Sequence, residues 1–367
     1  MRRTLAALIA LGAVFSIYLP QRGEDFVYYY CAGRSAAQGR SPYEAAPYQA
    51  CIAAALGRVN PHDSKAAGSA YPPPAVRLFQ AFAALTYPAA YGLWNAALLA
   101  ASVLLLAGFS ARSALGLLLV VWPGFVSSWS HHKLTIPLFL AFLLGIRLVE
   151  LGRHRLGGAL LSVLCLQPQW LAAAGLFLAA QRRGRALAAL AAASLLLFLL
   201  ASPAWLGPWL ASAAFHSDNF IAFDNQSLFV SLYKRVGPHF VVDMTWFKAA
   251  RYGASAGLAL LAWRFAARRD SESLALFLGL MVLAQPYSHA SDALWAFPLF
   301  LAFLARLDRR LRFPAGLLFC AAFLLSGGFA PGRLHRPADR DRLGYLSCLA
   351  AAGYGLASFA RRRATGR

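Results

Sequence analysis

The chain has 367 residues, of which 59% are hydrophobic and only 13% are charged. A soluble domain carries about a quarter charged residues, so this composition excludes an ordinary soluble enzyme and predicts an all-α polytopic membrane protein in a lipid bilayer. The formal net charge of +21 is concentrated in arginine clusters between apolar runs. This pattern marks cytoplasmic loops and argues against a nucleic-acid partner.

Apolar runs of about 17–25 residues recur along the chain, which is the length that a helix needs to cross the hydrocarbon core. They lack the alternation of barrel strands, so helices are expected. The expected spans lie at 5–20, 89–109, 114–130, 134–151, 186–203, 248–267, 273–288, 293–306, 313–329 and 343–360, with two short helices in 156–180. These helices form a single domain, 1–367, of about 10–12 membrane helices with both termini in the cytoplasm.

Two long segments between the expected spans are predicted to lie outside the cell membrane. The first external loop, 21–87, carries interfacial helices, and the second external loop covers 204–246. The run Gln167-Pro168-Gln169 divides 156–180 into two short or re-entrant helices. Polar residues and proline at membrane depth are tolerated where they line a cavity, so this break is expected near the external face.

The cysteines are few and scattered. Cys31 and Cys51 share the first external loop, where a disulfide is chemically permitted, and the sequence leaves open whether they pair. We interpret Cys165, Cys320 and Cys348 as small apolar packing residues. The sequence has no Cys/His cluster with metal-ligand spacing, so no metal site is expected.

Only 14 residues are acidic, and Asp25 follows the first apolar run directly. A carboxylate held at the membrane surface is a candidate catalytic base. Two other interpretations stay open: Asp25 is the N-cap of a helix that starts at Phe26, or its neighbour Glu24 is the base. Most other polar side chains fall on the same external face, whereas a transporter places ionisable groups near the midplane. This distribution favours an enzyme that acts on a lipid-carried substrate at the external leaflet.

Six sequence blocks carry a more specific signal through their order and spacing. They are Asp25-Phe26-Val27-Tyr28-Tyr29-Tyr30, continuing through Ala32-Gly33-Arg34 to Gly39-Arg40-Ser41-Pro42-Tyr43; Tyr71-Pro72-Pro73-Pro74, followed by an apolar run and Leu93-Trp94; His131-His132-Lys133; Gln167-Pro168-Gln169; Asn225-Gln226-Ser227-Leu228-Phe229; and the run from Gln285 to Leu294, which includes His289 and Asp292. Together they resemble glycosyltransferase family 87, whose members have the GT-C fold and use polyprenyl-phosphate sugars as donors. Gln167 stands where the family usually has lysine, and His131 stands where it tends to have glycine.

The resemblance implies a GT-C-like bundle whose first external loop carries the site. It implies transfer of a hexose, mannose first, from polyprenyl phosphate to an extracytoplasmic glycolipid or glycan acceptor, with inversion and Asp25 as general base. The lipid-linked sugar is itself the donor substrate, so neither a cofactor nor a metal is implied. The implied location is the bacterial inner (plasma) membrane, with the site on the periplasmic or extracellular side. The candidate substrate-binding residues are Tyr28, Tyr29, Arg34, Tyr71, His131, His132, Lys133, Gln167, Gln169, Asn225, Gln226, His289 and Asp292.

Structural interpretations compete with these roles. The tyrosines are typical membrane-interface anchors, and His131-His132-Lys133 is consistent with a simple span boundary. Tyr71 and the three prolines after it are consistent with a stop before an interfacial helix. Gln167 and Gln169 can satisfy broken-helix backbone, and Asp292 can begin a helix. At the level of function, a transporter or flippase of lipid-linked sugars and a non-catalytic assembly partner are the alternatives.

Overall fold

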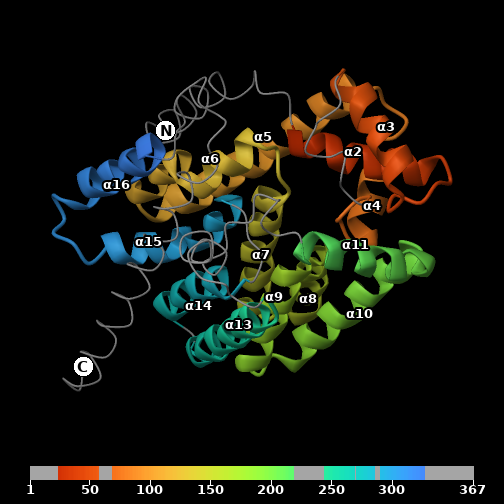
Figure 1. Ribbon diagram of the computed structural model, residues 1–367. Coiled ribbons are helices and arrows are strands. Elements are labelled where there is room, and N and C mark those ends of the chain that lie inside the picture. The colour runs from red at the N-terminus through yellow and green to blue at the C-terminus, as the bar shows by residue number, and fades with distance from the viewer. Residues whose placement is uncertain (1–23, 58–67, 219–243, 269, 286–289, 327–367) are drawn as a thin grey trace. The chain divides into compact units, whose positions relative to one another are not determined.

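The computed structural model describes residues 24–57, 68–218, 244–268, 270–285 and 290–326 (Figure 1). These residues form helices and no strand, which confirms the all-α prediction for the described part of the chain. The α-helices are α2 (Glu24–Ala37), α3 (Ala45–Leu56), α4 (Pro73–Gln80), α5 (Tyr87–Arg112), α6 (Pro123–Ser130), α7 (Thr135–Glu150), α8 (His154–Leu161), α9 (Pro168–Ala180), α10 (Gly184–Leu200), α11 (Leu206–Asp218), α13 (Met244–Ala266), α14 (Ser271–Ala284), α15 (Phe297–Leu304) and α16 (Arg312–Ser326). The 3₁₀ helices are η2 (Ala114–Val121), η3 (Ser162–Leu166), η4 (Pro203–Trp205) and η6 (Ala290–Ala296).

The described residues fall into two compact units. The N-terminal unit comprises 24–104 and 129–218, and the C-terminal unit comprises 105–128 and 244–326. The boundaries between the units fall within α5 and near the end of α6. The prediction of one membrane domain with two external loops stays a prediction.

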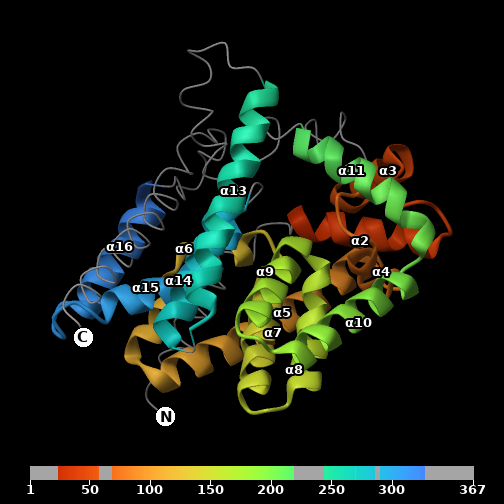
Figure 2. The same ribbon diagram turned by 90° about the horizontal axis from the view of Figure 1, so that it is seen from below.

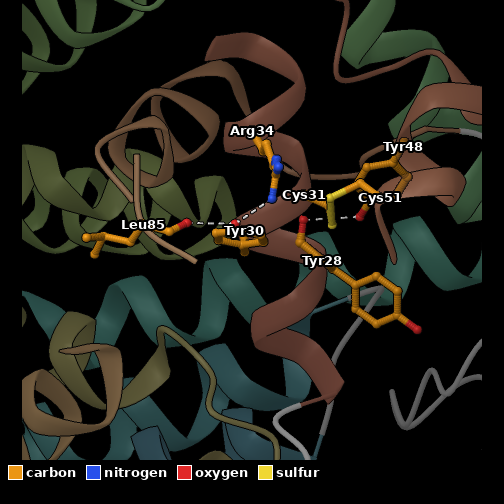
Figure 3. Close-up of a disulfide and its surroundings, with 7 residues drawn as sticks. All are labelled: Tyr28, Tyr30, Cys31, Arg34, Tyr48, Cys51 and Leu85. Atoms are coloured by element: carbon orange, nitrogen blue, oxygen red, sulfur yellow. Dashed lines mark hydrogen bonds between the residues drawn. A yellow bond between two sulfur atoms is a disulfide. The ribbon is translucent and has the colours of Figure 1, made fainter. Parts of the chain in front are cut away.

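Helix α2 packs against α3 and α4 in the N-terminal unit. Cys31 on α2 and Cys51 on α3 form a disulfide with their Cα atoms 5.6 Å apart, so the two cysteines that the sequence left open do pair (Figure 3). On the side facing α4, a Cβ atom at Gly33 would lie 2.4 Å from the backbone carbonyl of Phe79. The absence of a side chain at Gly33 therefore lets the two helix backbones touch.

Prolines set the start of α4. Pro72 is extended, with φ −65° and ψ 153°, and Pro73 and Pro74 occupy the first turn of the helix. Proline is well suited to that turn because its missing N–H has no intrahelical partner there and its φ angle is already helical. The interpretation of Tyr71-Pro72-Pro73-Pro74 as a stop before a helix is therefore confirmed.

Glycines allow close packing among α7, α8 and α10, which lie side by side in both views (Figures 1 and 2). A Cβ at Gly157 on α8 would lie 2.7 Å from the carbonyl oxygen of Gly145 on α7. A Cβ at Gly158 would lie 2.1 Å from the carbonyl oxygen of Ala186 on α10. Small residues at such crossings are typical of helices that pack inside a membrane.

The predicted break at Gln167-Pro168-Gln169 is confirmed. The 3₁₀ helix η3 ends at Leu166, Gln167 is not helical, with φ −136° and ψ 88°, and α9 begins at Pro168. The residue before a proline is pushed out of the helical region by contact with the proline ring, which accounts for this break.

In the C-terminal unit, α13 packs along α14, and α6 begins against η6. The indole of Trp122 donates a hydrogen bond of 2.8 Å to the carbonyl oxygen of Ala293. A Cβ at Gly124 would lie 2.1 Å from the backbone nitrogen of Leu294, so the two backbones are in contact.

Two expected spans differ from the structure. Residues 114–130 form η2 and α6, separated at Trp122, rather than one helix, because Trp122 precedes Pro123 and is extended. Residues 293–306 divide between η6 and α15, next to Pro298. Spans 5–20 and 343–360 lie outside the described residues, as does most of loop 204–246, of which η4 and α11 are seen.

Among the described residues, one helix segment, Tyr87–Ala111, has the length and apolar composition to cross a bilayer. A second candidate is a bent pair, Gly184–Leu200 with Pro203–Ala214, whose two helices meet at 89°. Five shorter apolar helices accompany them. The helical class is therefore confirmed for this part of the chain, while the expected number of spans stays a prediction.

Candidate functional site

An ion pair joins two of the predicted site residues in the N-terminal unit. Lys133 Nζ lies 3.3 Å from Asp25 Oδ2. The Lys133 side chain is 11% exposed and the Asp25 side chain is 22% exposed, so the pair is largely shielded but still open to solvent on one side. Attraction between opposite charges is stronger in such a setting than in bulk water.

Asp25 lies inside the first turn of α2, because the helix already includes Glu24. The interpretation of Asp25 as the N-cap of a helix starting at Phe26 is therefore wrong. A carboxylate in a first turn is stabilised by the partial positive charge of the helix N-terminus. Lys133 comes from the short turn between α6 and α7, so 131–133 lie at a helix boundary, and the interpretation of this boundary as the end of a membrane span stays a prediction.

The negative charge of Asp25 acts on the phenol of Tyr71. Burial raises the pKa of the Tyr71 phenol well above its ordinary value, and the charges of Tyr29 and Asp25 raise the pKa further. The Tyr71 ring packs on the Tyr29 ring with 4.2 Å between their centroids. The Tyr71 phenol therefore stays protonated at neutral pH. It can donate a hydrogen bond to an oxygen atom that binds beside the Asp25 carboxylate.

The segment that carries Tyr71 is held by side chains that were not predicted as site residues. They come from the turn before α3 and from α11. The carbonyl oxygens of Ser69, Ala70 and Tyr71 accept hydrogen bonds from Ser212 (2.9 Å), Trp209 (3.2 Å) and Tyr43 (2.9 Å), respectively. Because three successive carbonyls are fixed, the position of Tyr71 is set by the fold.

Tyr28 and Tyr29 have different surroundings. Tyr29 is 3% exposed, and its ring lies against Tyr71 and stacks on Phe79 at 4.7 Å. Tyr29 therefore supports the site by packing. Tyr28 is half-buried, its carbonyl oxygen accepts a hydrogen bond of 3.3 Å from Tyr48, and its ring points away from the disulfide (Figure 3). Tyr28 follows Asp25 by three positions, so the two side chains share a face of α2.

Arg34 is not brought to Asp25. It lies in the last turn of α2, about 13 Å along the helix axis from Asp25. Its guanidinium donates a hydrogen bond of 2.9 Å to the hydroxyl of Tyr30, which donates to the carbonyl oxygen of Leu85 at 2.9 Å (Figure 3). This exposed arginine is therefore tied to the connection between α4 and α5.

The two histidines before Lys133 differ in exposure. His131 is half-buried, whereas His132 is 1% exposed and its Nε2 shares a hydrogen bond of 2.7 Å with the hydroxyl of Tyr91. His132 is therefore engaged inside the protein, and the sequence-based prediction that it binds substrate receives no support from this arrangement. Lys133 is the cation that the turn directs to Asp25.

The remaining candidates belong to later elements of the chain or lie outside the described residues. Gln167 and Gln169 are half-buried at the start of α9, and the side-chain oxygen of Gln167 has no hydrogen-bond partner. Asp292 is 2% exposed in η6 of the C-terminal unit. Asn225, Gln226 and His289 lie outside the described residues. Within the described ranges, no group of three or more His, Cys, Asp or Glu side chains has the arrangement of a metal site.

Chemically, this arrangement combines the carboxylate of Asp25, which can accept a proton, with the ammonium of Lys133 and the neutral phenol of Tyr71. A carboxylate can take a proton from a hydroxyl, an ammonium can neutralise a phosphate oxygen, and a phenol can orient either group. The three groups come from α2, from the turn before α7 and from the segment before α4.

Neither a curated protein nor a solved structure matches the chain significantly. The model of glycosyltransferase family 87 matches residues 70–286, which include Tyr71 and Lys133, while Asp25 and the disulfide precede the matched region. The match covers more than half of the sequence and agrees with the family that the six sequence blocks resemble. The chain is therefore a member of glycosyltransferase family 87.

Proposed function

We propose that this family 87 protein is a membrane glycosyltransferase that moves a hexose, mannose first, from polyprenyl phosphate to an extracytoplasmic glycolipid or glycan. The observation that carries the proposal is the ion pair between Asp25 and Lys133, 3.3 Å apart. It places a base and a phosphate-binding cation side by side, which are the two groups that this transfer requires.

In the proposed reaction, the acceptor hydroxyl attacks the anomeric carbon of the sugar as Asp25 takes the hydroxyl proton. The bond between the anomeric carbon and the phosphate oxygen breaks, and polyprenyl phosphate leaves with that electron pair. The new glycosidic bond forms on the opposite face of the sugar, so the configuration inverts. A single displacement needs only one carboxylate at the reacting centre, unlike the paired carboxylates of glycosidases.

Lys133 has two partners in this scheme. Without donor it neutralises Asp25, and with donor its ammonium also faces the phosphate, whose negative charge grows as the bond breaks. Stabilising charge where it develops in the transition state is among the largest contributions to enzymatic rate. Lys133 lies just before the start of α7, so this helix anchors the backbone of Lys133.

The disulfide supports an external site. Cys31 and Cys51 pair within α2 and α3, and Cys31 is in the same helix as Asp25. Disulfides persist in oxidising compartments and are rare in the cytosol, where thiols are kept reduced. Together with the arginine-rich connectors, which mark the cytoplasmic side, this bond supports a site on the periplasmic face of the bacterial inner membrane.

The membrane setting follows from composition. The mean hydropathy of the chain is +0.54, and the helix segment Tyr87–Ala111 has the length to span a bilayer. A polyprenyl donor is itself a membrane lipid, so its phosphate lies at the headgroup level. An interfacial site in the first external loop would meet the phosphate at that depth.

The experiment that tests the proposal is a transfer assay on the purified full-length chain in lipid nanodiscs. Radiolabelled polyprenyl-phosphate mannose, glucose and galactose are supplied separately, with octyl mannoside and a bacterial envelope lipid extract as acceptors. Transfer of label from one donor, abolished in Asp25→Asn, supports the proposal. If no donor reacts, or if label crosses the bilayer on intact polyprenyl phosphate without transfer, the protein is not this enzyme.

A further inference from the structure

Two side chains on α5 hold the residue that precedes Lys133. The hydroxyl of Tyr91 shares a hydrogen bond of 2.7 Å with His132 Nε2, and the indole of Trp94 donates a hydrogen bond of 2.8 Å to the carbonyl oxygen of His132. The Tyr91 and His132 rings also pack, with 4.8 Å between centroids. Both the ring and the backbone of His132 are therefore fixed to one helix.

The same two side chains contact the residue that follows Asp25. Phe26 is fully buried, and its ring stacks on Trp94 with centroids 6.0 Å apart and an interplanar angle of 17°. The Phe26 ring also lies 5.9 Å from the Tyr91 ring. One face of α5 thus contacts the chain neighbour of each partner in the ion pair.

His132 needs such support because of its backbone. Its φ angle is +56°, in the left-handed region that residues with a Cβ atom disfavour. His132 lies in the turn between α6 and α7, and the next residue, Lys133, pairs with Asp25. Interactions around a residue must over-determine such a conformation for it to persist, and Tyr91 and Trp94 supply them.

We infer that Tyr91 and Trp94 are positioning residues for the transfer. They hold Phe26 and His132, and thereby keep the charged groups of Asp25 and Lys133 at their distance and orientation. This inference rests on the proposed function for its kinetic consequence, although the geometry of the ion pair is a property of the fold. Neither residue touches the reacting atoms. Their effect on catalysis passes through the Asp25–Lys133 pair.

The variant Tyr91→Phe keeps the ring and loses only the hydroxyl, and Trp94→Phe keeps an aromatic ring but loses the N–H donor. Each is expected to lower kcat about tenfold or more, since small misplacements of catalytic groups have large effects on rate. The KM for the acceptor is expected to stay within about twofold, because a change in the geometry of the ion pair acts mainly on the transition state. In a Lys133→Met background, Tyr91→Phe should produce little further loss, because both changes disturb the same pair.

Ser102→Ala is the matched control. Ser102 is fully buried on the same helix, and its hydroxyl accepts a hydrogen bond of 2.9 Å from Trp129. The hydroxyl also donates a hydrogen bond of 2.7 Å to the carbonyl oxygen of Leu98, so the change removes two buried hydrogen bonds, neither of which His132 makes. Ser102→Ala is expected to lower the melting temperature as Tyr91→Phe does, while leaving kcat near that of the wild type.

A second measurement does not require activity. Lys133 in the full-length protein is acetylated with an amine-reactive reagent, and the extent is read by mass spectrometry against the other lysines. Labelling of Lys133 should rise several-fold in Tyr91→Phe and Trp94→Phe but not in Ser102→Ala. Increased labelling without turnover of any donor would reject the proposed function and keep the positioning role. Unchanged labelling together with unchanged kcat, or equal effects in Ser102→Ala, would overturn the positioning role.

Discussion

Asp25 and Lys133 reach each other from segments that are far apart in the sequence, the first turn of α2 and the turn before α7, and their charged atoms lie 3.3 Å apart. Because both are in the N-terminal unit, the pair is defined by the packing of one body. It gives α2 a fixed electrostatic contact with the turn before α7.

Replacing Asp25 by Asn should abolish transfer while the protein still folds. Asn has the shape of Asp but cannot accept a proton at neutral pH, so turnover is expected to fall by about 10²–10⁴. The measurement is label transfer under saturating donor. Glu24→Gln is the matched control, because it removes the adjacent carboxylate in the same turn of α2. If Glu24→Gln is inactive and Asp25→Asn retains full activity, the base is Glu24.

Lys133→Met should lower kcat by about 10²–10³, the range seen when one group that stabilises a developing negative charge is removed. Lys133→Arg keeps the charge but changes its shape and reach, so it should recover part of the rate. The KM for the donor should rise more in Lys133→Met than in Lys133→Arg, because only the former loses the phosphate contact. Equal donor KM values in the two variants would argue against that contact.

The Cys31–Cys51 bond should stabilise the packing of α2 against α3. Their sequence separation is 20 residues, and closing a loop of that order restricts the unfolded chain by about 3 kcal/mol. The double variant Cys31→Ser/Cys51→Ser should therefore melt at lower temperature, as followed by intrinsic fluorescence. Adding a reductant should lower the melting temperature of the wild type and leave the double variant unchanged. A wild type that is insensitive to reductant under unfolding conditions would contradict this role.

Tyr71 should make the fold sensitive to alkali. Its pKa in the folded protein is raised above the ordinary value of 10.0, chiefly by burial, so the stability that the neutral phenol contributes is fully present below about pH 10. That stability is lost as the pH rises from the unfolded pKa through the folded one, because the unfolded state releases its proton first. Tyr71→Phe has no proton to lose, so its melting temperature should fall less steeply above pH 10.

Activity should respond differently to pH. Since the Tyr71 phenol stays protonated at neutral and mildly alkaline pH, it cannot supply the alkaline limb of a rate profile between pH 7 and pH 9. Tyr71→Phe should therefore change the height of that profile and leave its alkaline limb in place. An alkaline limb that disappears in Tyr71→Phe would mean that the phenol ionises during catalysis.

Local rules predicted the features that depend on neighbouring residues. Proline chemistry fixed the start of α4 after Pro72 and the break before Pro168, and both are found. The same rules, applied to Pro123, would have divided the expected span 114–130. The residues on both sides of Pro123 are hydrophobic, so one continuous span across the proline was predicted.

Pairing between distant residues was beyond local rules. Asp25 and Lys133 were each predicted as site residues, in separate roles, because nothing in the spacing says that α2 folds back onto the turn before α7. His132 was expected to bind substrate, because cationic side chains pair with phosphate oxygens. In the structure, the hydroxyl of Tyr91 and the indole of Trp94 hold His132 inside the protein.

The positions that sequence reasoning missed had a detectable signal. Tyr91 and Trp209 lie in or beside apolar runs, where their rings look like ordinary packing residues, and Trp94 was noted only as the end of the second sequence block. A buried tyrosine or tryptophan nevertheless needs a partner for its polar tip. A search for the carbonyl oxygen or imidazole nitrogen that bonds to each hydroxyl or indole N–H would have pointed to the turn before α7 and to the segment before α4.

The missing side chain at Gly33 has an evolutionary and practical consequence. The backbones of α2 and α4 are in contact at Phe79, and the Cys31–Cys51 disulfide joins α2 to α3. The three helices therefore form one packed unit. Homologous recombination that broke the sequence between α2 and α4 would join surfaces that no longer match. A chimera built to alter acceptor choice should therefore exchange 24–85 as one cassette.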